Sequence, residues 1–329
     1  MCNRFMHPLR VAVQWLFLFF TCSLGVEFYR FVLHCRGESA VFVPRPEGIE
    51  GFLPISALVS LRGWILSGEI NPIHPAGLVI FLTIIGISFL LKRSFCSWLC
   101  PVGTLAELCW KVGFRLFRRN FRPPSWLDIA LRGIKYLLLL FFLGSIMVLM
   151  APGSVLSFIS SDYNKIADIR MLDFFLHPSL LSLIIMGILV LLSFPVKNVF
   201  CRFLCPYGAL LGIVSSCSPV KVTRNKSLCI SCGVCSGTCP SYLPVMELER
   251  VHSPECLGCW RCIAHCPVHG ALEMKLPGGR YAVPGLLFAL LVVLLFWGGS
   301  VVGKVTGVWH TAIPLQEYVI LSRDPAVRH

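Results

Sequence analysis

Eight cysteines in the last third of the chain fall into two runs of identical spacing. The first run reads CISCGVCSGTCP from Cys229 and the second reads CLGCWRCIAHCP from Cys256, so each follows the pattern C-x2-C-x2-C-x3-C-P. In this pattern the first three thiolates of a run hold one iron–sulfur cluster, and the fourth holds the cluster of the other run. The spacing therefore predicts two [4Fe–4S] clusters with crossed ligands. The predicted ligand sets are Cys229, Cys232, Cys235 and Cys266 for one cluster, and Cys256, Cys259, Cys262 and Cys239 for the other.

Structural zinc is the alternative for these cysteines, because pairs spaced C-x2-C also suit a tetrahedral zinc site. A zinc site does not explain the third cysteine three residues further on or the proline that ends the pattern, and both features occur twice. The double pattern favours iron–sulfur clusters.

Four further cysteines lie in a longer repeat. One copy runs from His74 and the other from His177; each begins His-Pro, continues as an apolar segment and ends in F-C-x3-C-P-x-G. Thiols four residues apart share one face of a helix, and the residue before a proline ends or bends that helix. We predict that the two pairs form one shared redox centre, a third iron–sulfur cluster or another metal site. The four cysteines are Cys96, Cys100, Cys201 and Cys205.

Four cations flank these pairs, and we expect them to lower the thiol pKa values and to offset the charge of a tetrathiolate cluster. They are Lys92, Arg93, Lys197 and Arg202. The alternatives for the four thiols are a Cu(I) site, a disulfide pair, or inert cysteines of an apolar helix.

Three residues are candidates for a quinol site, because quinol oxidation releases protons that a carboxylate or imidazole must accept. They are Glu27, His74 and His177. Each also has a structural interpretation: the histidines precede prolines at helix starts, and Glu27 is three residues from Arg30 and could pair with it.

Composition places the chain in a membrane. Of its 329 residues, 56% are hydrophobic and only 14% are charged, against about 25% charged in an ordinary soluble protein. The net charge of +13 fits Lys/Arg-rich cytoplasmic loops, and no zinc-finger or RNA-binding motif points to nucleic acid. The spacing of the 17 cysteines indicates iron–sulfur ligands on a reducing face rather than a disulfide-rich secreted protein.

We expect five membrane spans, at about residues 11–33, 76–92, 134–151, 179–197 and 282–303. The loop 92–135 has nine Lys and Arg against Glu107 and Asp128, which predicts that it is cytoplasmic. The amino end and both clusters would then lie on the cytoplasmic side of a bacterial inner membrane, and the carboxyl tail would lie on the outer side. The fold class is mainly α: a polytopic helix bundle of two parallel hairpin repeats, with a bacterial-type ferredoxin-like segment.

Three domains follow from this division. Residues 1–220 form the transmembrane domain, residues 221–280 the two-cluster segment, and residues 281–329 the fifth span with a short external tail.

The paired F-C-x3-C-P motifs and the double-cluster segment together resemble the NapH/NosR/CcoG-type membrane polyferredoxins. That family includes the quinol-dehydrogenase membrane subunit of periplasmic nitrate reductase, a membrane regulator needed for nitrous-oxide reductase, and a copper reductase of cytochrome oxidase assembly. The resemblance covers about residues 74–275 and implies four spans with clusters on the cytoplasmic side. The chain departs from the pattern by lacking the large amino-terminal flavin-binding domain of the nitrous-oxide regulator, and by adding a fifth span and a tail.

Three functions are consistent with these features. The first is an electron-transfer subunit of an oxidoreductase, which passes electrons between the quinone pool or a cytoplasmic donor and a respiratory or periplasmic partner. The second is a membrane copper reductase, in which the C-x3-C thiolates bind the metal. The third is a redox-sensing assembly factor. No histidine pair on facing spans suggests haem, so the sequence shows no carrier across the whole bilayer.

Overall fold

The computed structural model describes residues 2–277 and 281–324, and they are mainly helical. The chain divides into two compact units, each built from three separate segments. The first unit contains residues 1–19, 84–139 and 186–295, and the second contains residues 20–83, 140–185 and 296–329.

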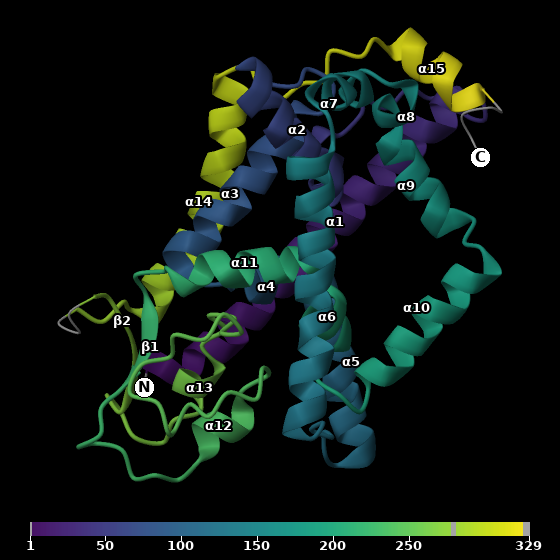
Figure 1. Cartoon of the computed structure of the whole chain (residues 1–329). Coiled ribbons are helices and arrows are strands. Elements are labelled where there is room, and N and C mark those ends of the chain that lie inside the picture. Colours follow the sequence, from purple (N-terminus) through teal and green to yellow (C-terminus); the bar gives the residue numbers. More distant parts are fainter. Residues whose placement is uncertain (1, 278–280, 325–329) are drawn as a thin grey trace. The chain divides into compact units, whose positions relative to one another are not determined.

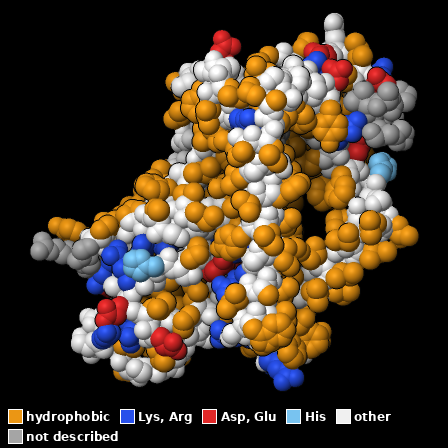
Figure 2. Space-filling view, viewed as in Figure 1, with side chains coloured by type: hydrophobic (Ala, Val, Ile, Leu, Met, Phe, Trp, Pro, Cys, Tyr) orange, Lys and Arg blue, Asp and Glu red, His pale blue; other side chains and the backbone are white. Residues whose placement is uncertain are grey.

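Five helices contribute residues to both units. They are α1 (Cys2–Arg36), α3 (Pro75–Leu91), α6 (Ser125–Leu143), α10 (Leu180–Ser193) and α14 (Gly285–Val305). Their exposed side chains are largely apolar, and Figure 2 shows orange hydrophobic side chains over much of the helical surface. An apolar exposed surface is what a lipid environment favours.

Within the described residues, three helical segments are long and apolar enough to cross a membrane: Phe5–Arg36, Ser125–Leu149 and Gly285–Val305. A fourth would be the pair α9 (Ala167–Leu176) and α10, if these helices, bent by 75°, form one broken span. The expected second span corresponds to α3, which is apolar but has only 17 residues. It ends where Lys92 adopts φ 61°, a left-handed conformation that stops a helix. Five spans therefore remain a prediction.

The first unit contains the cysteine-rich part of the chain (Figure 1). Strands β1 (Lys221–Arg224) and β2 (Leu272–Lys275) pair antiparallel, with Val222 opposite Met274, and so bring the two ends of the cysteine segment together. Its short elements are α4 (Ser94–Trp98), α5 (Pro101–Phe117), the π turn η3 (Phe200–Leu204), α11 (Pro206–Ser216), α12 (Val234–Thr238) and α13 (Arg261–Ala264).

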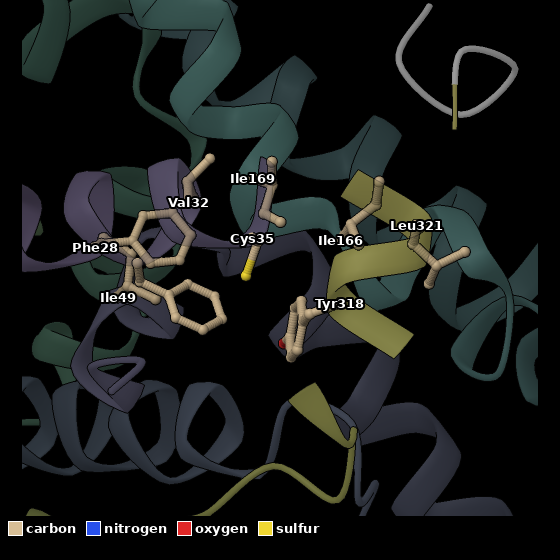
Figure 3. Packing of buried hydrophobic residues seen from close by; sticks show 9 residues of the cluster. Phe28, Val32, Cys35, Ile49, Ile166, Ile169, Tyr318 and Leu321 are labelled. Carbon is tan, nitrogen blue, oxygen red and sulfur yellow. The ribbon is translucent and has the colours of Figure 1, made fainter. Parts of the chain in front are cut away.

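The second unit has its own apolar core, formed where Phe28 and Val32 of α1 meet Ile169 of α9 and Tyr318 of α15 (Figure 3). Beside it, Arg45 bonds to both Glu50 and Asp168, and all three side chains are buried. The other elements of this unit are η1 (Glu47–Phe52), α2 (Pro54–Ser67), the π segment η2 (Gly144–Leu149), α7 (Pro152–Ile159), α8 (Asp162–Lys165) and α15 (Leu315–Arg323).

Candidate iron–sulfur centres

The two cysteine runs fold into loops with the same backbone conformation. Ser231 and Gly233 have φ values of 53° and 74°, and the equivalent Gly258 and Trp260 have φ values of 59° and 60°. Left-handed residues placed between right-handed ones turn successive N–H groups toward one side, which makes an anion-binding concavity found at many iron–sulfur sites. A left-handed Trp is uncommon, so the repeat of this geometry at Trp260 indicates a functional constraint.

One cavity is lined by cysteines from both runs. Three come from the first run, Cys229, Cys232 and Cys235, and the fourth is Cys266 from the end of the second run. Apolar side chains such as Leu272 complete the lining. This grouping is the first ligand set that crossed ligation requires.

A second cavity has the reciprocal arrangement. Its lining includes Cys256, Cys259 and Cys262 of the second run together with Cys239 from the end of the first. Pairing of β1 with β2 closes the segment so that each fourth cysteine reaches the other cavity.

The donor chemistry of both cavities fits a [4Fe–4S] cluster, which takes four thiolates and is tuned by apolar surroundings and by hydrogen bonds to its sulfurs. Burial, together with the neighbouring Cys259 thiol, raises the pKa of Cys239 to about 12, so a bound metal would have to displace the proton. Within residues 2–277 and 281–324, no three His, Cys, Asp or Glu side chains converge on a single-ion site. In a [4Fe–4S] cluster each of the four thiolates binds a different iron, so the four sulfur atoms need not converge on one point.

The second cysteine of each membrane motif does not continue the helix of the first, and the expectation of one shared helical face is wrong. Cys96 lies in α4, but Cys100 is the extended N-cap residue of α5 (ψ 120°). Likewise Cys201 lies in the π turn η3, and Cys205 caps α11 (ψ 106°). The proline that follows each of these cysteines occupies the first helical position and disfavours a helical conformation for the residue before it, in agreement with the extended ψ values of Cys100 and Cys205.

The structure nevertheless brings the four membrane-motif cysteines together. The Cys201 thiol is close enough to interact electrostatically with those of Cys96, Cys100 and Cys205. Burial raises the pKa of Cys201, the other three thiols raise it further, and the Arg93 guanidinium lowers it. Arg93 therefore acts in the expected direction, but burial and the neighbouring thiols outweigh it, and the pKa of Cys201 is raised overall.

Among the described contacts of the four flanking cations, those of Arg93 include the thiols of the membrane-motif cysteines. Its guanidinium interacts with Cys96 and Cys205 and also lies 3.4 Å from Glu255, the residue before Cys256. Lys92 faces Cys256 instead. Lys197 lies over the rings of Trp110 and Tyr242, and Arg202 makes a two-pronged ion pair with Asp128 at 2.8 Å for each bond.

Glu255 joins the membrane motifs to the second cysteine loop. The Lys135 ammonium donates to both of its carboxylate oxygens, at 2.7 and 2.8 Å, and the Tyr136 hydroxyl donates at 3.0 Å. The same loop is held by α4, because the Ser97 hydroxyl donates to the Leu257 carbonyl and the Trp98 indole N–H donates to the Gly258 carbonyl. Sequence reasoning did not identify this anchoring.

Glu107 is a second anchor. It accepts hydrogen bonds from Arg10 of α1, at 2.6 and 2.8 Å, and from Arg261 of α13, at 3.0 Å. The sequence contained a signal for it, since Glu107 and Asp128 are the only acids in a strongly basic loop. Each of the two is an ion-pair centre in the structure.

The three quinol candidates are not brought into one site. The His74 ring is buried; its Nε2 donates to the Asn164 carbonyl at 2.6 Å and its Nδ1 faces Glu50 at 3.3 Å. Glu27 and His177 are exposed, and His177 lies at the bend between α9 and α10. Among the described contacts, none joins any two of the three.

Two family models match the chain. A 4Fe-4S binding domain matches twice, at residues 73–124 and 178–225, the stretches that contain the membrane motifs. A 4Fe-4S dicluster domain matches residues 221–267. No solved structure matches the chain.

The candidate electron transport protein YccM of Escherichia coli is 40% identical over 327 residues, which cover 97% of this chain and 91% of YccM. The chain belongs to the NapH/NosR-type 4Fe–4S membrane polyferredoxins. The ferredoxin-type protein NapH of Escherichia coli is 25% identical over 53% of this chain and 59% of its own length. The regulatory protein NosR of Pseudomonas aeruginosa is 27% identical over 56% of this chain and 25% of its own length. Members of this family transfer electrons through iron–sulfur centres.

Proposed function

We propose that this polyferredoxin carries electrons between a donor at the cytoplasmic face of the inner membrane and a redox partner, through two crossed-ligand [4Fe–4S] clusters. The observation that carries the proposal is the pair of cavities, each lined by three cysteines of one run and the fourth of the other. The clusters would supply the redox chemistry, and the protein supplies ligands, burial and orientation.

The burial of the two ligand sets suggests an order of centres. Each set has buried cysteines, Cys235 in the first and Cys239 and Cys256 in the second, but Cys232 of the first set is exposed and the second set has no exposed cysteine. The first centre would exchange electrons with a soluble partner, and the second would face the membrane motifs through Glu255 and Arg93.

We further propose that Cys96, Cys100, Cys201 and Cys205 hold a third centre that links the membrane to the second cluster. Their mutual proximity and the match of a 4Fe-4S binding domain to both motifs support this. The quinone pool is the candidate donor on the membrane side, and a respiratory complex or periplasmic reductase is the candidate partner. The cytoplasmic position of the clusters rests on the Lys/Arg excess of residues 92–135.

A copper reductase or redox-sensing assembly factor is the second candidate, because the same four buried thiols would also suit Cu(I). Metal analysis separates the two. Full-length protein purified without oxygen should contain about twelve irons if all three centres are [4Fe–4S], and about eight if only two form. Cys96→Ser combined with Cys201→Ser should remove iron and not copper.

The same preparations, mixed with a reduced quinol, test the direction of transfer. Quinol-dependent bleaching of the cluster absorption that is lost in the double variant would support a membrane donor. If the intact protein and the double variant both contain about eight irons per chain, and the variant loses no copper, the third centre is refuted. Absence of iron from the intact protein would refute the electron-transfer function.

A further inference from the structure

Among the described residues, the first unit also contains an open cavity of about 330 Å³ that no cysteine lines. This volume lies within the range of small-molecule sites, about 300–1,000 Å³. The cavity lies between α5, the segment that follows α10, and residues of both cysteine runs. Its lining includes Lys111, Phe114, Arg115, Lys197 and Arg261.

Four cations face this cavity, and a single carboxylate lies near them. Glu107 pairs with Lys111 at 2.8 Å and with Arg261 at 3.0 Å, but it also neutralises Arg10. Within residues 2–277 and 281–324, Arg115 makes no ion pair. Lys197 contacts a carbonyl at 3.4 Å and aromatic rings, and it interacts electrostatically with Cys239, a proposed cluster ligand. Arg115 therefore gives the cavity a positive charge that no ion pair among the described residues offsets, and this charge attracts anions.

Lysine and arginine side chains donate charge-assisted hydrogen bonds to the acceptor oxygens of a phosphate group. The cations that line this cavity therefore match a phosphate.

Apolar side chains beside the cavity indicate where such a phosphate comes from. Phe114 lines the cavity and is half-exposed, and the next turn of α5 exposes Leu116 and Phe117. A basic pocket next to an exposed apolar helix face is the arrangement that takes a lipid head group while the acyl chains stay in the membrane.

We propose that this cavity binds the phosphate group of an anionic ligand, and that the ligand is an anionic phospholipid. No cysteine lines the cavity, although Thr238, Arg261 and His265 of its lining each precede a proposed cluster ligand. Lys111 and Arg115 supply the charge, and Phe114 contacts the glycerol and upper acyl region. An inorganic or soluble organic phosphate has the same acceptor chemistry but not the apolar part.

The test uses the full-length, cluster-loaded protein in detergent, titrated with phosphatidylglycerol, with phosphatidylcholine, and separately with inorganic phosphate. Bound ligand is counted by native mass spectrometry. Phosphatidylglycerol should bind at one saturable site, and Arg115→Gln should weaken it about fivefold, the effect of about one surface cation. Arg119→Gln is the matched control, because Arg119 is exposed four residues away and does not line the cavity.

Iron content should be the same in both variants, which shows that each is folded. Preference for phosphatidylglycerol with loss only in Arg115→Gln supports the proposal. Saturable binding of inorganic phosphate that Arg115→Gln weakens, without lipid preference, would support the phosphate site and overturn the lipid assignment. Equal weakening by both variants, or no saturable binding of either ligand, would overturn the site itself.

Discussion

Replacing Glu107 with glutamine should loosen the second cysteine loop. The carboxylate joins Arg10 in α1 to Arg261 in α13, the short helix that contains Cys262. The Arg10 side chain is 1% exposed, so Glu107→Gln leaves a guanidinium buried beside a neutral amide. Breaking a buried pair by removing one partner costs about 3–5 kcal/mol.

The assay is the rate at which the clusters lose iron to a chelator in detergent, followed by visible absorption. If iron leaves through opening of this loop, a loss of about 3–5 kcal/mol raises the rate by about 10²-fold to 4 × 10³-fold, since each 1.4 kcal/mol is tenfold. Glu273→Gln is the matched control, because its pair with Lys275 lies on the surface and is worth less than about 1 kcal/mol.

The pH dependence of iron release provides a second test of the Glu107 anchor. Burial alone would raise the pKa of Glu107, but the charges of Arg10, Lys111 and Arg261 outweigh it and hold the pKa well below its usual value. A depressed folded-state pKa contributes stability above the unfolded-state value, about 4.3, and loses it as the pH falls toward the folded-state value. The intact protein should therefore release iron faster below about pH 4, and Glu107→Gln should lack this component. Equal rates in Glu107→Gln and Glu273→Gln would refute the anchoring role.

Two further predictions concern ligation and topology. Cys239→Ser should damage the cluster of the second run, because Cys239 lines the cavity of Cys256, Cys259 and Cys262; selective loss of the first-run signal in electron paramagnetic resonance would contradict crossed ligation. Reporters fused at residues 120 and 245 should give cytoplasmic signals, and those at 165 and 329 external ones; agreement between 245 and 329 would exclude the fifth span. Residue 329 lies outside the described part of the chain.

The sequence alone determined the chemistry of the cysteine segment. Two copies of C-x2-C-x2-C-x3-C-P predict two [4Fe–4S] clusters with crossed ligands, because the spacing within each run limits which thiolates can share a cluster. Composition likewise determined the membrane class, since hydropathy acts residue by residue.

The tertiary structure decided which distant residues meet. The spacing predicted that Cys96 and Cys100 lie on one helical face, but Cys100 is the N-cap residue of a new helix because a proline follows it. The four thiols are close to one another because separate segments pack together. The anchors Glu107 and Glu255 have partners up to 162 residues away, which no local pattern encodes. The excess of Lys and Arg in residues 92–135 is evident from the sequence. The cavity lined by Arg115 and Lys197 could not be predicted, because it depends on how α5 packs beside the cysteine segment.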